Sequence, residues 1–332
     1  MNTSLSKFLK IGIPLGLGIF LIWYSYSQFS AEQLEEIKFY FRKADYGFVI
    51  LAVTFSILSH VSRAYRWNFM LEPLGYKPKL ANNFMAIAIA YLMNIFIPKS
   101  GEVTRGIVLD KYEGVPFEKG FGTIISERVV DLIFLMAFTA LALFLQFDEL
   151  YVYLSQIINP TKILIGIAGL ICMGILFLLF LKYSRSKLQQ KVKKFFDGLK
   201  DGVLSILKMN KKGAFILHTF IIWGLYLLSF YTSTLALDET SGISNGTLII
   251  TFVVGSFAFA FTNSGFGSYP FFVAGILAVF GIAETVGTAF GWIVWTSNIA
   301  SILLMGGLSF LILPFYNNHT TKKLAADSKS QQ

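Results

Sequence analysis

Charged side chains gather in three short segments of an otherwise apolar sequence: 59–67 (SHVSRAYRW), 98–105 (PKSGEVTR) and 125–131 (ISERVVD). An ionisable side chain inside a membrane is costly, so it usually marks a transport pathway or a paired structural lock. Arginine suits two-point contact with a phosphate group better than lysine does. The three segments therefore predict an anion-binding site, a structural ion-pair network, or both at once.

The third segment places Glu127 and Asp131 four residues apart, so the two carboxylates share a helical face beside Arg128. Their net charge of −1 predicts that another cation, Arg63 or Arg105, completes the set. In the first segment, Arg63 and Arg66 are candidates for phosphate contact. The alternative for Arg66 and Trp67 is a snorkelling arginine beside an interfacial aromatic belt.

The second segment has the composition of a sharp turn. Pro98 is expected to end the incoming helix, Gly101 to permit a tight reversal, and Ser100 to cap a new helix that starts at Glu102. Glu102 and Arg105 are three residues apart and are expected to pair on one face. The alternative is an ordinary helix end at the membrane interface.

A fourth segment, NSGFG at 263–267, combines an amide with two glycines. Gly265 and Gly267 let the backbone approach a ligand closely beside Asn263, and close helix packing is the alternative. The sequence contains no GxSxG elbow, P-loop or metal-ligand spacing, so no cofactor and no metal are expected.

The composition indicates what must position these residues. The chain has 332 residues, of which 55% are hydrophobic and only 14% are charged, and a soluble domain of this length could not bury so much apolar surface. We therefore predict an all-α, polytopic membrane protein with a single transmembrane domain over 1–316 and a polar tail over 317–332. Apolar length predicts six full spans, at 9–28, 46–65, 121–147, 161–182, 213–236 and 286–315.

Charge sets the orientation. Residues 182–212 hold ten Lys/Arg against two Asp, so this loop is expected to be cytoplasmic, and so are both termini. Its apolar residues have helical spacing, which predicts an amphipathic helix on the membrane surface, or else a docking site for a protein partner.

With this orientation, both flanks of 80–98 are cytoplasmic and both flanks of 247–281 are on the outer side. A re-entrant hairpin satisfies each, although two full spans would also satisfy the second. Each half then contains two spans, a hairpin and a span, which predicts inverted halves at 1–150 and 151–316, as in many secondary transporters.

The motifs together resemble a flippase-like integral membrane family related to the transmembrane region of lysylphosphatidylglycerol synthetases. The resemblance spans nearly the whole chain and rests on four stretches: RAYRW (63–67), NIFIPKSGEVTR (94–105), SERVVD (126–131) and NSGFG (263–267). It implies a lipid translocase of the bacterial inner membrane that moves charged or head-group-modified lipids.

We therefore expect a transporter-like protein with no covalent chemistry, no nucleic-acid partner and a phospholipid or polyprenyl-linked lipid as substrate. No soluble aminoacyl-transferase domain follows the last span, so synthesis of lysyl-phosphatidylglycerol is not expected. The alternatives are a polytopic glycosyl- or lipid-modifying transferase, for which the predicted outer loops are short, and a non-catalytic membrane partner protein. The expected substrate-binding residues are Arg63, Arg66, Pro98, Gly101, Glu102, Arg105, Glu127, Arg128, Asp131, Asn263, Gly265 and Gly267.

Overall fold

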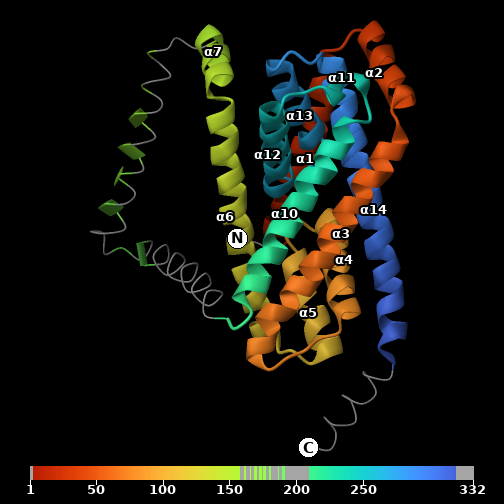
Figure 1. Cartoon of the computed structure of the whole chain (residues 1–332), viewed down its shortest axis with the longest axis vertical. Coiled ribbons are helices and arrows are strands. Elements are labelled where there is room, and N and C mark those ends of the chain that lie inside the picture. The colour runs from red at the N-terminus through yellow and green to blue at the C-terminus, as the bar shows by residue number, and fades with distance from the viewer. Residues whose placement is uncertain are drawn as a thin grey trace, which may run out of the picture.

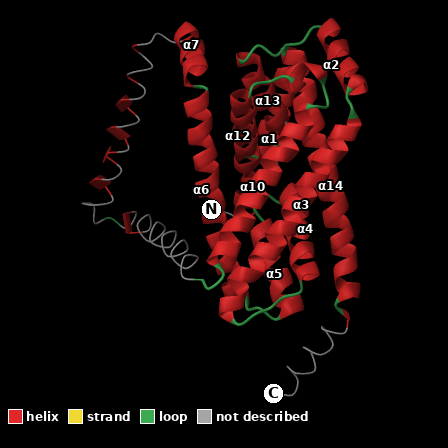
Figure 2. Ribbon diagram, in the orientation of Figure 1, coloured by secondary structure: helices red, strands yellow, loops and turns green. Residues whose placement is uncertain are grey.

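The chain is described by a computed structural model that covers residues 3–157 and 209–318, with scattered residues between 161 and 190. Helices make up the regular structure of this part of the chain, and it contains no strand (Figure 2). The predicted helical membrane class is thereby confirmed. The predicted span at 161–182 and the basic segment at 182–212 lie outside the fully described ranges.

Four helices are long and apolar enough to cross a membrane: α3 (Tyr46–Leu71), α6 (Phe117–Leu145), α10 (Lys212–Thr234) and α14 (Glu284–Tyr316). Each coincides with a predicted span. The predicted first span corresponds to α1 (Thr3–Ser27). Shorter helices connect or flank them, namely α2 (Ala31–Lys43), η1 (Glu72–Leu74), α7 (Phe147–Ile157) and α11 (Asp238–Ser241).

The first predicted hairpin is a pair of packed helices, α4 (Leu80–Phe96) and α5 (Gly101–Glu113), joined by residues 97–100. The 17 residues of α4 extend about 26 Å, which is less than the roughly 30 Å of a hydrocarbon core. The outer ends of the pair meet, because the backbone N–H of Lys79 donates to Glu113 over 3.1 Å. The chain therefore turns back here and returns to the side from which it came.

The second predicted hairpin consists of α12 (Asn245–Phe261) and α13 (Ser268–Val279), which also pack on each other. The 12 residues of α13 extend only about 18 Å, so this helix is too short for a full span. The hairpin interpretation of 247–281 therefore fits better than two full spans.

The two hairpins lie toward opposite ends of the bundle (Figure 1), and they meet where Asn263 Nδ2 of the second tip donates to Ile95 O near the end of α4 over 3.2 Å. Backbone of α13 packs on Gly287 and Gly291 of α14, whereas α4 packs on Gly306. Between these contacts, Trp295 Nε1 donates to Ser264 O in the second tip over 2.9 Å. Because α14 extends about 50 Å, both tips lie deep within the thickness of the bundle.

The packing partners follow the same order in both parts of the chain. The first hairpin helix α4 packs on α14, and the corresponding helix α12 packs on α6. Each of these contacts is fixed by an amide at the end of the long helix: Asn317 bonds to Asn82 over 2.8 Å, and Gln146 bonds to Ser244 over 3.2 Å. This exchange of hairpins supports the predicted inverted halves, which remain a prediction.

Ion pairs join the segments that flank α3 and α10 at both ends. Lys211 contacts Glu72 over 2.7 Å at one end, and Lys43 contacts Glu239 over 2.9 Å and Asp238 over 3.1 Å at the other. Hydrogen bonds to Glu239 and Asp238 raise the pKa of Lys43, so its ammonium group stays charged. These partly exposed pairs connect the ends of two helices that also pack directly on each other.

The first tip differs in detail from the sequence-based expectation. Lys99, with φ 61°, makes the reversal, and the Ser100 hydroxyl donates to Ile97 O instead of capping the next helix. The Asn94 side chain takes the capping role, because its Oδ1 accepts from the N–H of Gly101 over 2.7 Å. Asn94 lies a full seven residues before Gly101, beyond the spacing from which a cap is usually recognised.

Gly101 is required for close packing, not for the turn itself. A Cβ atom at this position would lie 2.4 Å from the carbonyl oxygen of Ala90, a backbone atom that cannot rotate away. We expect Gly101→Ala to force the hairpin helices apart and to destabilise the fold by about 1–3 kcal/mol. In contrast, a Cβ at Gly122 in α6 meets nothing within 4 Å, so Gly122→Ala should stabilise by about 0.5–1 kcal/mol. Thermal unfolding in detergent measures both, and an equal shift in both variants would contradict the assignment.

Candidate functional site

An ion-pair network joins α3, α5 and α6 below the first tip. Glu127 on α6 lies at its centre, with Oε1 2.5 Å from Arg63 and 3.3 Å from Arg66, and Oε2 2.9 Å from Arg105. One turn further along α6, Asp131 lies 2.6 Å from Arg63 and 3.0 Å from Arg66. Both cations that the sequence suggested as partners, Arg63 and Arg105, therefore join the set.

The deeper part of the network is completely buried. Glu127, Arg66 and Arg105 are at most 1% exposed. Aromatic rings cover the guanidinium faces, since Arg105 stacks on Trp67 at 3.7 Å and Arg66 lies 5.1 Å from the ring of Phe215. These groups face protein on all sides, which is the geometry of a structural lock.

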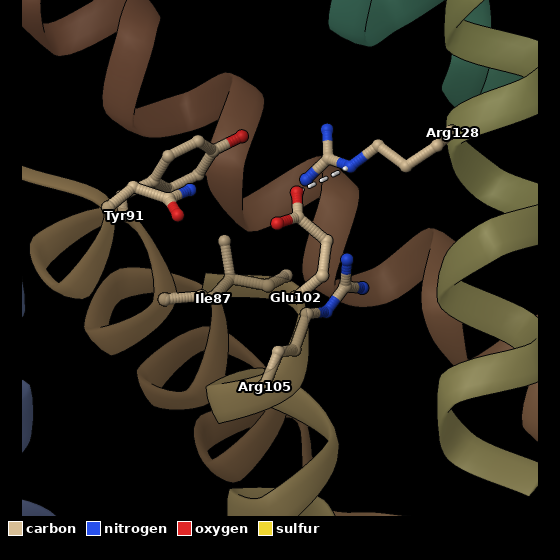
Figure 3. A pocket seen from close by; sticks show the side chains of 7 residues that line it. Ile87, Tyr91, Glu102, Arg105 and Arg128 are labelled. Carbon is tan, nitrogen blue, oxygen red and sulfur yellow. Dashed lines mark ion pairs between the residues drawn. The ribbon is translucent and has the colours of Figure 1, made fainter. Parts of the chain in front are cut away.

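Arg128 and Glu102 form the outer part of the network (Figure 3). Arg128 Nε lies 3.2 Å from Glu102, and Arg128 Nη1 lies 3.6 Å from Asp131. The predicted pair between Glu102 and Arg105 does not form, because Glu102 reaches α6 whereas Arg105 turns to Glu127. The Arg128 side chain remains 36% exposed, so part of it stays accessible to a ligand.

The network holds more positive than negative charge. Four arginines face three carboxylates, which leaves a surplus of one positive charge. Lys99 at the first tip adds another, because no carboxylate within the described ranges lies at ion-pair distance from it. The outer surface of the network is therefore suited to an anion.

A cavity of about 650 Å³ lies against this outer surface, between the two tips. Its cationic end is formed by Arg63, Arg128 and Lys99, together with Glu102 and Asp131. The other walls come from α10, α12, α13 and α14 and are largely aromatic and hydroxyl-bearing. Trp223, Phe230, Phe252, Phe259, Tyr226 and Tyr269 are the aromatic members.

The structure separates the predicted site residues into three groups. Six line it: Arg63, Pro98, Glu102, Arg128, Asp131 and Asn263. Arg66, Arg105 and Glu127 belong to the buried lock behind it. Gly101, Gly265 and Gly267 do not line it and instead permit close packing, as shown by Gly267, where a Cβ would lie 2.3 Å from Gly18 O of α1.

Sequence reasoning missed two tyrosines of the cavity wall. Tyr226 OH accepts from Arg63 Nη2 over 3.2 Å, and Tyr91 packs on the ring of His60 at 4.7 Å. Both stand alone in apolar runs, where a tyrosine is equally typical of an interfacial belt. Only their contacts with side chains from another helix, Arg63 for Tyr226 and His60 for Tyr91, distinguish them.

The described residues contain no cluster of His, Cys, Asp or Glu that could hold a metal ion. The single cysteine, Cys172, is exposed. The carboxylates Glu102, Glu127 and Asp131 are each engaged by arginine, and the cavity presents hydrogen-bonding groups and positive charge to a ligand.

Four long apolar helices, two hairpins of shorter helices and a buried ion-pair network define a multi-pass helical membrane protein. The chain belongs to the family described as the lysylphosphatidylglycerol synthase TM region, whose model matches residues 11–317. It is 23% identical to a UPF0104 membrane protein of Methanocaldococcus jannaschii over 83% of this chain and 87% of that protein. A UPF0104 membrane protein of Pyrococcus horikoshii is 24% identical over 70% of this chain and 75% of its own length.

A shorter similarity connects the chain with the glycosyltransferase AglD of Haloferax volcanii. It is 31% identical over 91 residues, which is 27% of this chain and 15% of that protein. No solved structure matches the chain.

Proposed function

We propose that this protein moves lipid head groups between the two leaflets of a membrane. The observation that carries the proposal is the cavity between the hairpin tips, with its unbalanced cationic wall halfway along α14. A phosphate group is very costly to place in hydrocarbon, whereas Arg128 and Lys99 would replace part of its hydration. The head group would cross by way of this cavity, without covalent chemistry.

The surroundings of the tips suit the lipid tails. Phe96 and Ile97 next to the first tip are 61% and 47% exposed, and Phe261 next to the second is 76% exposed. Leu132, which lines the cavity from α6, is 50% exposed. Apolar side chains exposed at mid-depth face hydrocarbon, so the tails would remain in the bilayer while the head group occupies the cavity.

Filling the cavity tests the proposal. Ser256 lines the cavity, so Ser256→Trp should occupy it and abolish lipid movement in reconstituted vesicles. Leu304 lies on α14 and is 68% exposed, so Leu304→Trp adds the same ring where lipid surrounds it and should leave the rate unchanged. Equal rates in both variants, in wild type and in protein-free vesicles would refute the function.

The proposed location is the bacterial inner membrane, with both termini in the cytoplasm. Lys77 precedes the first hairpin, and Glu36 lies on α2 at the opposite end of the bundle. In a Cys172→Ser background, an impermeant thiol reagent added to intact cells should label Glu36→Cys and not Lys77→Cys. The reverse labelling would show that the protein has the opposite orientation in the membrane, and it would not affect the description of the two hairpins.

A lipid-modifying transferase is the second candidate, because of the similarity to 91 residues of AglD. General acid–base catalysis needs a carboxylate that is free to exchange a proton. Glu102 and Asp131, the carboxylates of the cavity wall, are both bound to arginine. Transfer of a labelled sugar to lipid by the purified protein would favour this alternative.

A protein partner that docks on residues 182–212 also remains a proposal. If the lysines of this segment can be replaced by glutamine without loss of lipid movement, the segment serves docking and not transport.

A further inference from the structure

The wall of the cavity that faces the ion-pair network carries neutral polar groups. Ser56, Ser229, Ser233, Ser256, Asn263 and Asn298 line it, and they come from α3, α10, α12, α14 and the second tip. Lipid tails would require no such groups, since a polar group beside hydrocarbon is costly unless it is hydrogen-bonded. Their convergence on one cavity from several helices indicates a polar ligand.

Several donors of this wall already bond to backbone carbonyl oxygens. Ser229 Oγ donates to Ala52 O over 2.7 Å, and Ser256 Oγ donates to Phe252 O over 2.8 Å. Asn298 Nδ2 likewise donates to Val294 O over 2.9 Å. The oxygens of these three side chains keep free lone pairs, and Asn298 keeps its second N–H. Trp223, which also lines the cavity, has a buried Nε1–H without a hydrogen-bond partner. The wall therefore offers mainly acceptors together with a few donors, and it is complementary to hydroxyl groups, which both donate and accept.

Asn263 gives this point independent support. Its Nδ2 donates to Ile95 O in the first tip over 3.2 Å, whereas its Oδ1 is buried with no hydrogen-bond partner. An unsatisfied buried acceptor is expensive, and an unmade hydrogen bond at a cavity is a common sign of a ligand group. Asn263 lines the cavity, so a donor on the ligand would complete it.

The charge of the cavity decides which donors fit. An ammonium group also donates hydrogen bonds, but it would need a free carboxylate. Within the described part of the chain, Glu102 is held by Arg128, and Asp131 is held by Arg63. An ammonium would instead meet the surplus positive charge of Arg128 and Lys99, and like charges at short range are strongly unfavourable. Uncharged O–H donors have no such conflict.

We propose that the preferred substrates are lipids whose phosphate carries an uncharged polyhydroxyl group, such as glycerol, inositol or a sugar, and that cationic head groups are disfavoured. The phosphate would contact Arg128 and Lys99, and the hydroxyls would donate to the wall formed by the serines, Asn263 and Asn298. This inference rests on the proposed function and specifies the substrate class of the same cavity.

Three lipids labelled on the acyl chain separate the two claims in vesicles that contain the full-length protein. Phosphatidylglycerol has the phosphate and two hydroxyls, phosphatidylmethanol has the same charge without hydroxyls, and lysyl-phosphatidylglycerol carries a net positive charge. We expect phosphatidylglycerol to move at least about tenfold faster than either of the others. Equal or faster movement of the cationic lipid, or of phosphatidylmethanol, would overturn the inference and leave the proposed function standing. No movement of any lipid beyond protein-free vesicles would refute the function itself.

A double variant assigns the preference to the wall. Ser256→Ala with Asn298→Leu removes two acceptors whose donors bond only to their own helices, so the fold is not expected to change. The rate for phosphatidylglycerol should fall about tenfold, and the rate for phosphatidylmethanol much less. Equal slowing of both lipids would show that the wall does not recognise hydroxyls.

A second variant tests the role of Lys99. Lys99→Gln should reduce the ratio of the rate for phosphatidylglycerol to the rate for the cationic lipid. An unchanged ratio would show that Lys99 does not contribute to the discrimination against cationic head groups.

Discussion

Replacing Glu127 by glutamine is expected to destabilise the folded protein by about 3–5 kcal/mol, because it leaves the buried Arg105 without a counter-charge and leaves Asp131 as the one buried carboxylate beside Arg63 and Arg66. Glu127 contacts Arg63, Arg66 and Arg105, and none of these four side chains is more than 3% exposed. Glutamine has nearly the same shape, so the loss reports charge and not packing. Thermal unfolding of the purified protein in detergent measures the effect.

A second substitution tests the cause of this loss. In the double variant Glu127→Gln with Arg105→Gln, the surplus returns to one positive charge, and much of the stability should be regained. Glu35 pairs with Lys38 on the exposed surface of α2, so Glu35→Gln serves as a control and should leave unfolding unchanged. A Glu127→Gln protein that is as stable as wild type would show that the network is not a structural lock.

Arg128→Gln is expected to slow lipid movement by about 10- to 100-fold, the equivalent of one charge-assisted hydrogen bond to the phosphate. Arg128 is the network arginine that combines a partly exposed side chain with a place on the cavity wall, so its loss should leave the fold intact. The substitution also removes the surplus charge of the network. Initial rates in vesicles measure the effect, with unfolding in detergent as the control for folding.

Arg128→Lys separates the role of charge from that of geometry. A lysine keeps the positive charge but lacks the planar fork, so an intermediate rate would indicate two-point contact with the phosphate. Full activity of Arg128→Gln would contradict the assignment of this residue to the substrate site.

The charge cluster was largely predictable because helical spacing and charge balance are local properties. Glu127 and Asp131 share one face at four-residue spacing, and their negative balance pointed to Arg63 and Arg105. The choice of partner for Glu102 was not predictable, since it depends on how α5 packs against α6. Two residues three positions apart pair only when no better partner lies on a neighbouring helix.

The hairpins were predictable for a different reason. Charged flanks restrict the side of the membrane on which each segment is expected to end, so the parity of crossings predicted a hairpin at 80–98 instead of a simple span. The same reasoning carries no information on the atomic detail of the tips. It could not show that Asn94 caps α5, or that Asn82 and Asn317 join α4 to α14 across 235 residues. Such contacts between distant segments come only from the fold.

The most direct test of the account is the movement of acyl-labelled phosphatidylglycerol in vesicles that contain the wild-type protein. An impermeant reductant added outside destroys only the label in the outer leaflet. If the cavity between the tips carries head groups, nearly all of the label should be lost with wild type, and only the outer-leaflet share in protein-free vesicles or with Ser256→Trp. Loss confined to the outer leaflet in wild-type vesicles, with the protein shown to be folded, would contradict the account.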